Sequence, residues 1–202
     1  PNTRPVIDDV AVVEFVARRA REVKLVKIFV YGGVTKGLEG KQLVEMGLLR
    51  EAGALAFTDG LHAVRNAQVM RNALSYAKAF GALIIQHPED PDLAEGGHMN
   101  EGELATRLGL SGIPTAAESI LLERDRQLVS LTGGRYHAAH LSTAEGLAVV
   151  RRAKAEGLHM TADTAPPYFA LNDLEVQGYR TFAKVSPPLR SEDDRLAGVE
   201  AL

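Results

Sequence analysis

In Ala82-Leu83-Ile84-Ile85-Gln86-His87, a short apolar run ends in a histidine. A polar turn and a helical stretch follow, which is typical of a buried parallel strand in a βα unit. The same arrangement recurs at Tyr136-His137-Ala138-Ala139-His140. Because α/β enzymes gather catalytic groups at the carboxyl ends of parallel strands, both terminal histidines are predicted to emerge there.

Strand-like and helix-like stretches alternate on both sides of these runs, which predicts a mostly parallel sheet. The expected strands cover residues 24–31, 54–58, 82–86, 136–140 and 158–162, with a further extended segment at 181–186. The expected helices cover residues 10–22, 39–52, 64–77, 101–108, 116–131 and 142–156. Five βα units fit an open doubly wound sheet, and they equally fit five-eighths of a TIM barrel. The default expectation is one partial domain over residues 1–202.

Composition excludes several classes of function. The 202 residues are 46% hydrophobic and 24% charged, as in ordinary globular chains. A net charge of -3 and the lack of a basic block among aromatics argue against nucleic-acid binding. No apolar run approaches the roughly 20 residues that span a bilayer. The absence of cysteine fits a reducing cytoplasm, where the protein is expected. The start without Met predicts an internal piece of a longer protein.

Three polar side chains follow successive predicted strands, namely Asp59, His87 and His140. The chain has no cysteine, which excludes thiolate zinc sites, disulfides and a cysteine nucleophile. Carboxylate and imidazole ligands from separate strands favour a catalytic zinc or two-metal hydrolytic site. The alternative is that each strand-end histidine only satisfies a hydrogen bond. His137 is expected on the opposite face of the strand from His140, so the two cannot serve one site.

Other chemistries have weaker support. The sequence has no Gly-x-Ser-x-Gly elbow, so Ser142 is expected to cap a helix and not to act as a nucleophile. It also has no dinucleotide-binding or Walker glycine pattern. No ligand role is expected for the remaining histidines, His62, His98 and His159.

Short motifs in a fixed order carry a resemblance to a known family. They are Pro1-Asn2-Thr3, Phe57-Thr58-Asp59-Gly60, His87-Pro88-Glu89-Asp90, Met99-Asn100-Glu101-Gly102, Ala117-Glu118, Arg124-Asp125, His140-Leu141-Ser142-Thr143, Ser186-Pro187-Pro188-Leu189-Arg190 and Glu192-Asp193-Asp194-Arg195. In this order and spacing the chain resembles the class I dihydroorotases of the amidohydrolase superfamily, over its whole length.

The resemblance implies a (β/α)8 TIM-like amidohydrolase barrel, of which this chain covers roughly strands 3 to 7. It implies a zinc-dependent cyclic-amide hydrolase that interconverts N-carbamoyl-L-aspartate and L-dihydroorotate in pyrimidine biosynthesis, and a homodimer. It makes His87 and His140 zinc ligands of barrel strands five and six. It makes Asn2 a substrate-carboxylate contact and puts Ser186 at a substrate-binding position. The His-x-His pair of strand one and the catalytic aspartate of strand eight should lie outside the chain.

Two departures from the family pattern support other functions. The family usually reads Phe-Thr-Asp-Asp-Gly, and Gly60 stands where its second, metal-bridging aspartate would be, so Asp59 is one residue early. Ser186 replaces the usual asparagine. These changes motivate a catalytically inactive dihydroorotase-like scaffold for aspartate transcarbamoylase as an alternative. A further alternative is a hydrolase of the hydantoinase, dihydropyrimidinase or allantoinase type.

Overall fold

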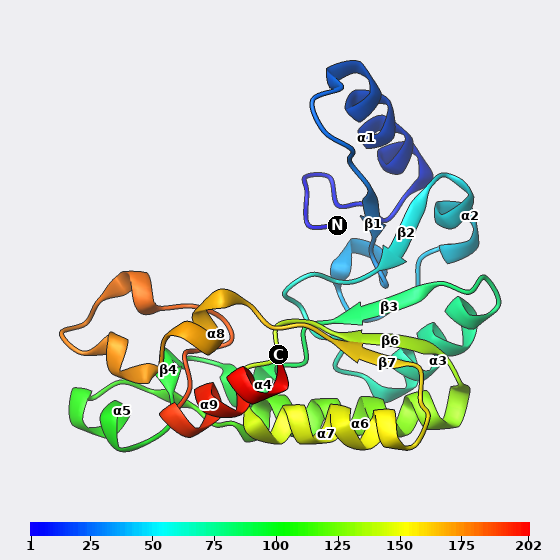
Figure 1. The fold of residues 1–202 in the computed structure, drawn as a ribbon. Helices are drawn as coiled ribbons and strands as arrows, with labels where there is room; N and C mark the ends of the chain where they lie inside the picture. The colour runs from blue at the N-terminus through cyan, green and yellow to red at the C-terminus, as the bar shows by residue number, and fades with distance from the viewer. The chain divides into compact units, whose positions relative to one another are not determined.

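The computed structural model describes all residues from Pro1 to Leu202 and contains a five-stranded sheet (Figure 1). Its order is β1-β2-β3-β6-β7, formed by β1 (Val30–Gly32), β2 (Ala54–Phe57), β3 (Leu83–Gln86), β6 (Arg135–Ala138) and β7 (Met160–Ala162). The first three strands pair in parallel. The predicted α/β class with a parallel sheet is confirmed.

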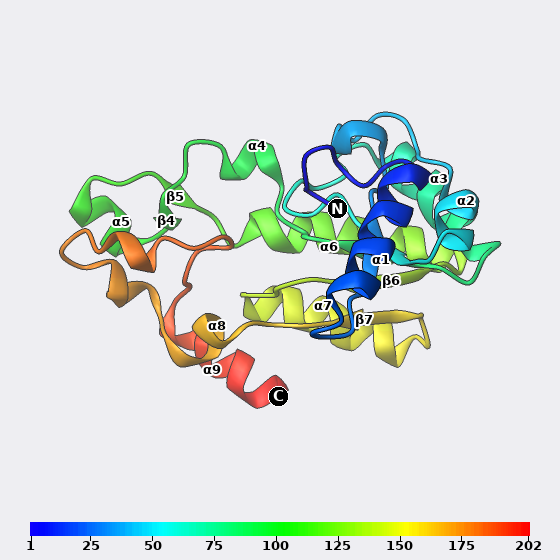
Figure 2. The same ribbon diagram turned by 90° about the horizontal axis from the view of Figure 1, so that it is seen from above.

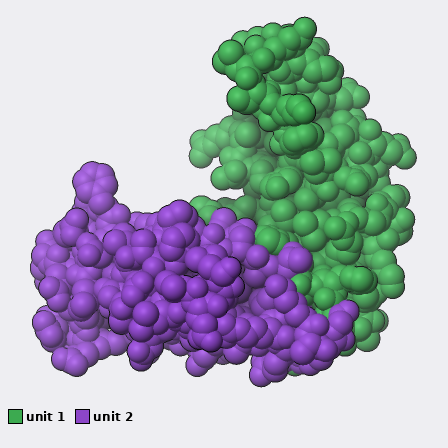
Figure 3. Space-filling model, viewed as in Figure 1, with its two compact units in different colours: residues 1–87, 127–137, 158–160 green, residues 88–126, 138–157, 161–202 purple.

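The chain divides into two compact units (Figure 3). The first comprises residues 1–87, 127–137 and 158–160, and the second comprises residues 88–126, 138–157 and 161–202. His87 belongs to the first unit and His140 to the second. The expectation of one partial domain over residues 1–202 stays a prediction.

The first unit contains most of the sheet together with three α-helices, α1 (Val10–Val23), α2 (Met46–Glu51) and α3 (Ala67–Lys78), and the 3-10 turn η1 (Lys36–Leu38). Helix α3 begins where the Asn66 side chain accepts hydrogen bonds from the backbone N–H groups of Gln68 and Val69. It packs against β3 with one apolar face, and the fully buried residues of this face are Met70, Ala73, Leu74 and Ala77.

The first strand is shorter than predicted. Helix α1 ends at Val23, and the next residue, Lys24, is left-handed with φ of 54°. Strand β1 begins only at Val30, the first residue paired with β2. Four apolar residues between them are exposed: Leu25, Val26, Ile28 and Phe29. Their apolar pattern is strand-like, but a strand also needs a hydrogen-bonding neighbour, which β2 does not provide here.

The second unit contains a two-stranded parallel sheet of β4 (Met99–Asn100) and β5 (Gly112–Ile113), which the sequence did not predict. It lies close to α5 (Figure 2). The helices of this unit are α4 (Pro91–Ala94), α5 (Glu103–Leu108), part of α6 (Ala116–Thr132), α7 (Ala144–Ala155), α8 (Pro166–Ala170) and α9 (Glu192–Ala201), with 3-10 turns η2 (Asp173–Val176) and η3 (Thr181–Ala183). The extended segment expected at 181–186 is therefore wrong, because a 3-10 turn occupies its first half.

No helix in the structure has both the length and the apolar character needed to cross a membrane. The longest, α6, has 17 residues.

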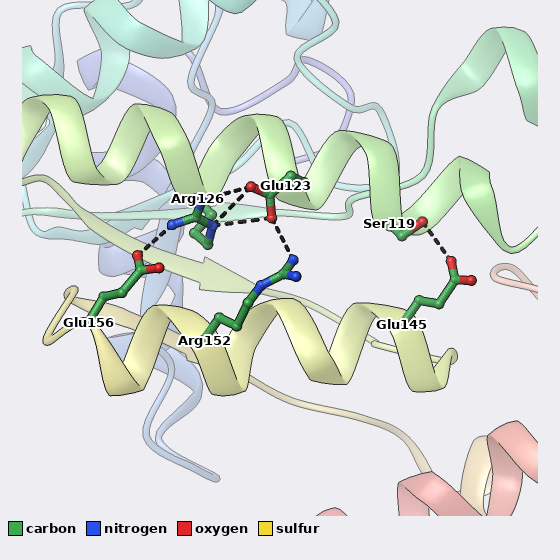
Figure 4. Close-up of polar contacts among 6 residues, drawn as sticks. All are labelled: Ser119, Glu123, Arg126, Glu145, Arg152 and Glu156. Carbon is green, nitrogen blue, oxygen red and sulfur yellow. Dashed lines mark hydrogen bonds and ion pairs between the residues drawn. The ribbon is translucent and has the colours of Figure 1, made fainter.

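Helices α6 and α7 are joined by an ion network on their facing surfaces (Figure 4). The Glu123 carboxylate accepts from Nη2 of Arg126 at 2.7 Å and from Nη2 of Arg152 at 2.8 Å. Arg126 also donates to Glu156, and farther along the pair Ser119 donates to Glu145 at 2.9 Å. Glu123 is therefore the acceptor that connects arginines of both helices.

Replacing Glu123 with glutamine should lower the free energy of unfolding by about 1 kcal/mol, because two arginines lose a shared counter-charge that is only partly exposed. Urea unfolding of the full-length protein measures this loss, and high salt should reduce it. Glu145→Gln is the matched control, because the Glu145 carboxylate accepts one hydrogen bond from the neutral hydroxyl of Ser119. This variant should lower the free energy of unfolding by less. A loss for Glu123→Gln that salt leaves unchanged would argue against the electrostatic explanation.

Candidate active site

Asp59 follows β2 and is buried, with 3% of its surface exposed. Oδ1 accepts from the backbone N–H groups of Val34 at 2.8 Å and Thr35 at 2.9 Å, and Oδ2 accepts from the Thr35 hydroxyl at 2.6 Å. Burial raises the pKa of Asp59, and the hydrogen bonds from Thr35 and Val34 oppose that rise. The carboxylate thus fastens the end of β2 to the loop after β1, and its metal-ligand role stays a prediction.

Gly60 lies next to Asn2, the predicted substrate contact. It is in the left-handed region with φ of 69°, and a side-chain carbon placed on it would lie 3.8 Å from Cβ of Asn2. That distance is an ordinary van der Waals contact, so the space beside Asn2 would admit a small side chain. The left-handed backbone favours glycine at this position for a conformational reason.

His87 directly follows β3, as predicted, and only 3% of its surface is exposed. The preceding residue is also fixed, because the Gln86 side chain accepts a hydrogen bond from the backbone N–H of Val64 at 2.8 Å. The imidazole therefore stands at the carboxyl end of a strand with a well-anchored neighbour.

His140 does not end a strand, contrary to the prediction. Strand β6 stops at Ala138, and His140 has φ of 63°, which is uncommon for a residue with a side chain. The strand-alternation argument that separated it from His137 therefore does not apply. Just before this turn, the carbonyl of Ala138 accepts a hydrogen bond from the backbone N–H of Asp163, which follows β7.

Asp163 also orients His140. Its Oδ1 accepts from the backbone N–H of His140 at 2.6 Å and lies 3.2 Å from the ring Nδ1. The backbone of Leu141 donates to the carbonyl of Asp163 at 2.9 Å and accepts from the Thr164 hydroxyl at 2.8 Å. A ring that is protonated on Nδ1 presents Nε2 as its acceptor nitrogen, and carboxylate partners of this kind are common for metal-binding histidines.

Glu118, on the first turn of α6, is a buried acceptor whose role is not predicted by the sequence. Oε2 accepts from the backbone N–H and hydroxyl of Ser142 at 2.9 and 2.7 Å, and Oε1 accepts from the same groups of Thr143 at 3.1 and 2.6 Å. Burial raises the pKa of Glu118, and the hydrogen bonds from Thr143 and Ser142 and the charge of Arg190 oppose that rise. The cap of α7 is Thr143, whose hydroxyl accepts from Gly146, so the expected capping role of Ser142 is wrong.

Arg190 extends this network. Its Nε donates to the Ser142 hydroxyl at 3.1 Å, and Nη1 donates to Oδ1 of Asn100 at 3.0 Å and to the carbonyl of Ile113 at 2.8 Å. Burial lowers the pKa of Arg190, and the charge of Glu118 is the largest opposing influence. A buried cation thus accompanies the buried carboxylate, which reduces the cost of holding either away from water.

Replacing Gly146 with alanine should destabilise the protein by about 2 kcal/mol, although alanine normally favours a helix by up to about 1 kcal/mol. A Cβ at this position would lie 2.2 Å from Oε1 of Glu118, too close for the two atoms to coexist. Gly198→Ala in α9 is the matched control, because its nearest atom would be the Tyr168 carbonyl at 3.8 Å. Urea unfolding checks both, and a Gly146→Ala protein as stable as the Gly198→Ala protein would contradict the packing described.

Ser186, predicted to contact substrate, lies beside the motif that follows His87. Its hydroxyl donates to Oε2 of Glu89 at 3.2 Å. The adjacent Pro187 carbonyl accepts from the Tyr168 hydroxyl at 3.1 Å, and burial, with the nearby charge of Glu89, raises the pKa of Tyr168. The loop before Arg190 is therefore fastened by side chains, while Ser186 is held next to Glu89.

The side chains of this chain can supply only some of the ligands of a metal ion. No group of three or more histidine, cysteine, aspartate or glutamate residues in the chain could hold a metal ion by itself. The ring of His140, with Nδ1 held by Asp163, nevertheless suits a metal ligand, and imidazole is a good donor for zinc. The residues present thus fit part of a ligand set.

Comparison with known proteins places these residues in a family. The family model described as Dihydro-orotase-like matches residues 1–146. The dihydroorotases of Desulforapulum autotrophicum and Geobacter metallireducens are each 46% identical over the whole chain, which covers 47% and 48% of their sequences. That of Syntrophobacter fumaroxidans is 48% identical over 96% of this chain and 44% of its own length. The chain therefore spans about half the length of the curated relatives it matches.

Solved structures give the same fold. The L-hydantoinase (dihydropyrimidinase) from Arthrobacter aurescens matches with a TM-score of 0.69 and 19% identity, over 92% of this chain and 43% of that one. A D-hydantoinase from Bacillus sp. AR9 matches with a TM-score of 0.70 and 19% identity, over 93% and 44%. These matches confirm the predicted fold, part of an amidohydrolase barrel. With the family model covering residues 1–146, the chain belongs to the dihydroorotase-like family.

Proposed function

We propose that the full-length protein is a dihydroorotase, which hydrolyses the cyclic amide L-dihydroorotate and also forms it from N-carbamoyl-L-aspartate. The observation that carries the proposal is 46% identity to curated dihydroorotases along all 202 residues. The hydantoinases share the fold at 19% identity, which gives no support for their substrates. Pyrimidine biosynthesis in the cytoplasm and a homodimeric assembly are part of the same proposal.

Zinc is the proposed metal, with His87 and His140 among its ligands. Both follow strands of the sheet, His87 directly and His140 in the turn that begins after β6 ends at Ala138. Zinc bound by such ligands supplies a Lewis acid for an amide carbonyl. Asp59 is the less favoured ligand, because its carboxylate already accepts three hydrogen bonds from Val34 and Thr35. The further ligands and the catalytic aspartate are proposed to lie in the half of the protein outside this chain.

Asn2 and Ser186 are the proposed substrate contacts. The Asn2 amide can donate to a carboxylate, which both L-dihydroorotate and N-carbamoyl-L-aspartate carry. Ser186 has a single hydroxyl, and in this structure it donates to Glu89. A substrate at Ser186 would therefore have to accept this hydrogen bond in place of Glu89, or donate to the hydroxyl oxygen.

One observation favours a second function, a catalytically inactive scaffold for aspartate transcarbamoylase. Gly60 supplies no carboxylate, and that of the neighbouring Asp59 is turned to the backbone of Val34 and Thr35. A protein of this kind would keep the fold and lose part of its metal-binding capacity. It would act by binding its partner enzyme.

Two measurements on the purified full-length protein separate these functions. A dihydroorotase turns over L-dihydroorotate and, in the reverse direction, N-carbamoyl-L-aspartate. A scaffold shows no turnover and co-elutes with aspartate transcarbamoylase in size-exclusion chromatography. Turnover without co-elution would exclude the scaffold function, and a folded zinc-loaded protein without turnover would exclude the enzyme.

A further inference from the structure

We propose that Glu118 is a positioning residue that fixes the orientation of His140 through the two residues Ser142 and Thr143. The proposal rests on the proposed function, in which His140 is a metal ligand. Glu118 itself contacts neither metal nor substrate in this proposal, and it acts only through the loop between β6 and α7.

Glu118 accepts four hydrogen bonds, all of them from two consecutive residues, Ser142 and Thr143. Each carboxylate oxygen accepts one hydrogen bond from a backbone N–H and one from a hydroxyl. The side chain is 2% exposed, so no water competes for these donors. Breaking any of them would leave a buried donor without its acceptor, which strongly favours the observed position of the two residues.

His140 needs such fixing because its backbone is strained. A left-handed φ in a residue with a side chain persists only where the surroundings enforce it. On one side, Asp163 binds the backbone N–H and Nδ1 of His140, and Thr164 binds the carbonyl of Leu141. On the other side, Glu118 holds the two residues that follow Leu141. The turn is thus clamped from both ends.

The rest of the structure is arranged to keep Glu118 in place. Gly146 has no side chain at a point where a Cβ would lie 2.2 Å from Oε1. Arg190 donates to the Ser142 hydroxyl, so this hydroxyl accepts from one side and donates to Glu118 on the other. The hydroxyl proton of Ser142 is therefore directed to the Glu118 carboxylate.

The experiment compares zinc affinity in the full-length protein, measured by competition with a chelator. Glu118→Gln places an amide N–H₂ against at least one pair of donors, so the clamp should loosen. We expect zinc binding at the His140 site to weaken about 10-fold to 100-fold, the range seen when groups that orient metal ligands are replaced. Glu118→Asp, which retains the charge, should recover part of the loss.

Controls separate positioning from general destabilisation. Glu123→Gln removes a carboxylate from the same helix without touching the β6–α7 loop, and it should leave zinc affinity unchanged. In a His140→Ala background, Glu118→Gln should cause no further loss of affinity. Urea unfolding verifies that each variant is folded under the conditions of the measurement.

A second readout does not depend on metal binding. In the metal-free full-length protein, Glu118→Gln should shift the ring nitrogen resonances of His140, and Glu123→Gln should not. A wild-type protein that binds no zinc would refute the proposed function, and the His140 resonances would still test the clamp. Unshifted His140 resonances in a folded Glu118→Gln protein, or zinc affinity within 2-fold of wild type, would overturn the proposal.

Discussion

Replacing His140 with alanine in the full-length protein should reduce the turnover of L-dihydroorotate by about 1000-fold, equivalent to ~4 kcal/mol of transition-state stabilisation. The reason is that a proposed metal ligand is lost, while the strained turn loses its tie from Nδ1 to Asp163. The same substitution at His87 should have a similar effect. For each purified variant, steady-state kinetics measure the loss of turnover and metal analysis measures the loss of zinc.

The chain offers a matched control for this prediction. His98 is an exposed histidine in the loop after His87, and only its backbone forms a hydrogen bond, to Ser111. His98→Ala should therefore keep full activity and full metal content. If His140→Ala were as active as His98→Ala, then His140 would not be a ligand, and its contact with Asp163 would be purely structural.

Replacing Asp59 with alanine should lower the free energy of unfolding by about 4 kcal/mol, because three donors of Val34 and Thr35 would lose a buried, charged acceptor. Asp59→Asn should cost only about 1 to 2 kcal/mol. Its Oδ1 can keep both backbone hydrogen bonds, and its Nδ2 can donate to the Thr35 hydroxyl. Urea unfolding of the full-length protein measures both values.

The zinc content of the Asp59 variants also tests whether Asp59 is a metal ligand. If the carboxylate only fastens the two strand ends, Asp59→Asn should bind zinc as tightly as the wild type. A large loss of zinc in a stable Asp59→Asn protein would instead identify Asp59 as a ligand, despite its hydrogen bonds. The two outcomes decide between the structural role observed and the ligand role predicted from sequence.

The alternation of apolar runs and helical stretches was enough to predict the parallel sheet, because buried strands and amphipathic helices differ in period. Strands β2 and β3 and helix α6 lie close to their predicted positions. The predicted first strand is too long at its start, since residues 25–29 have strand-like side chains but do not pair with β2. Pairing depends on a neighbouring segment, which a local pattern does not contain.

The candidate site was predictable in its residues more than in its geometry. A histidine after a strand is visible in sequence, but the left-handed turn at His140 depends on Asp163, which is distant along the chain. Glu118 belongs to the Ala117-Glu118 motif, but its partners Ser142 and Thr143 lie in the loop between β6 and α7, which the motif does not predict. The one local signal was Gly146 inside a helix, where glycine is unfavourable without a packing reason.

The central claim is that the full-length protein is a zinc-dependent dihydroorotase. Its most direct test is the turnover of L-dihydroorotate by purified full-length protein, before and after removal of metal with a chelator, and again after addition of zinc. Turnover should be lost with the metal and return with zinc. A folded protein that binds zinc and leaves L-dihydroorotate unchanged would contradict the claim.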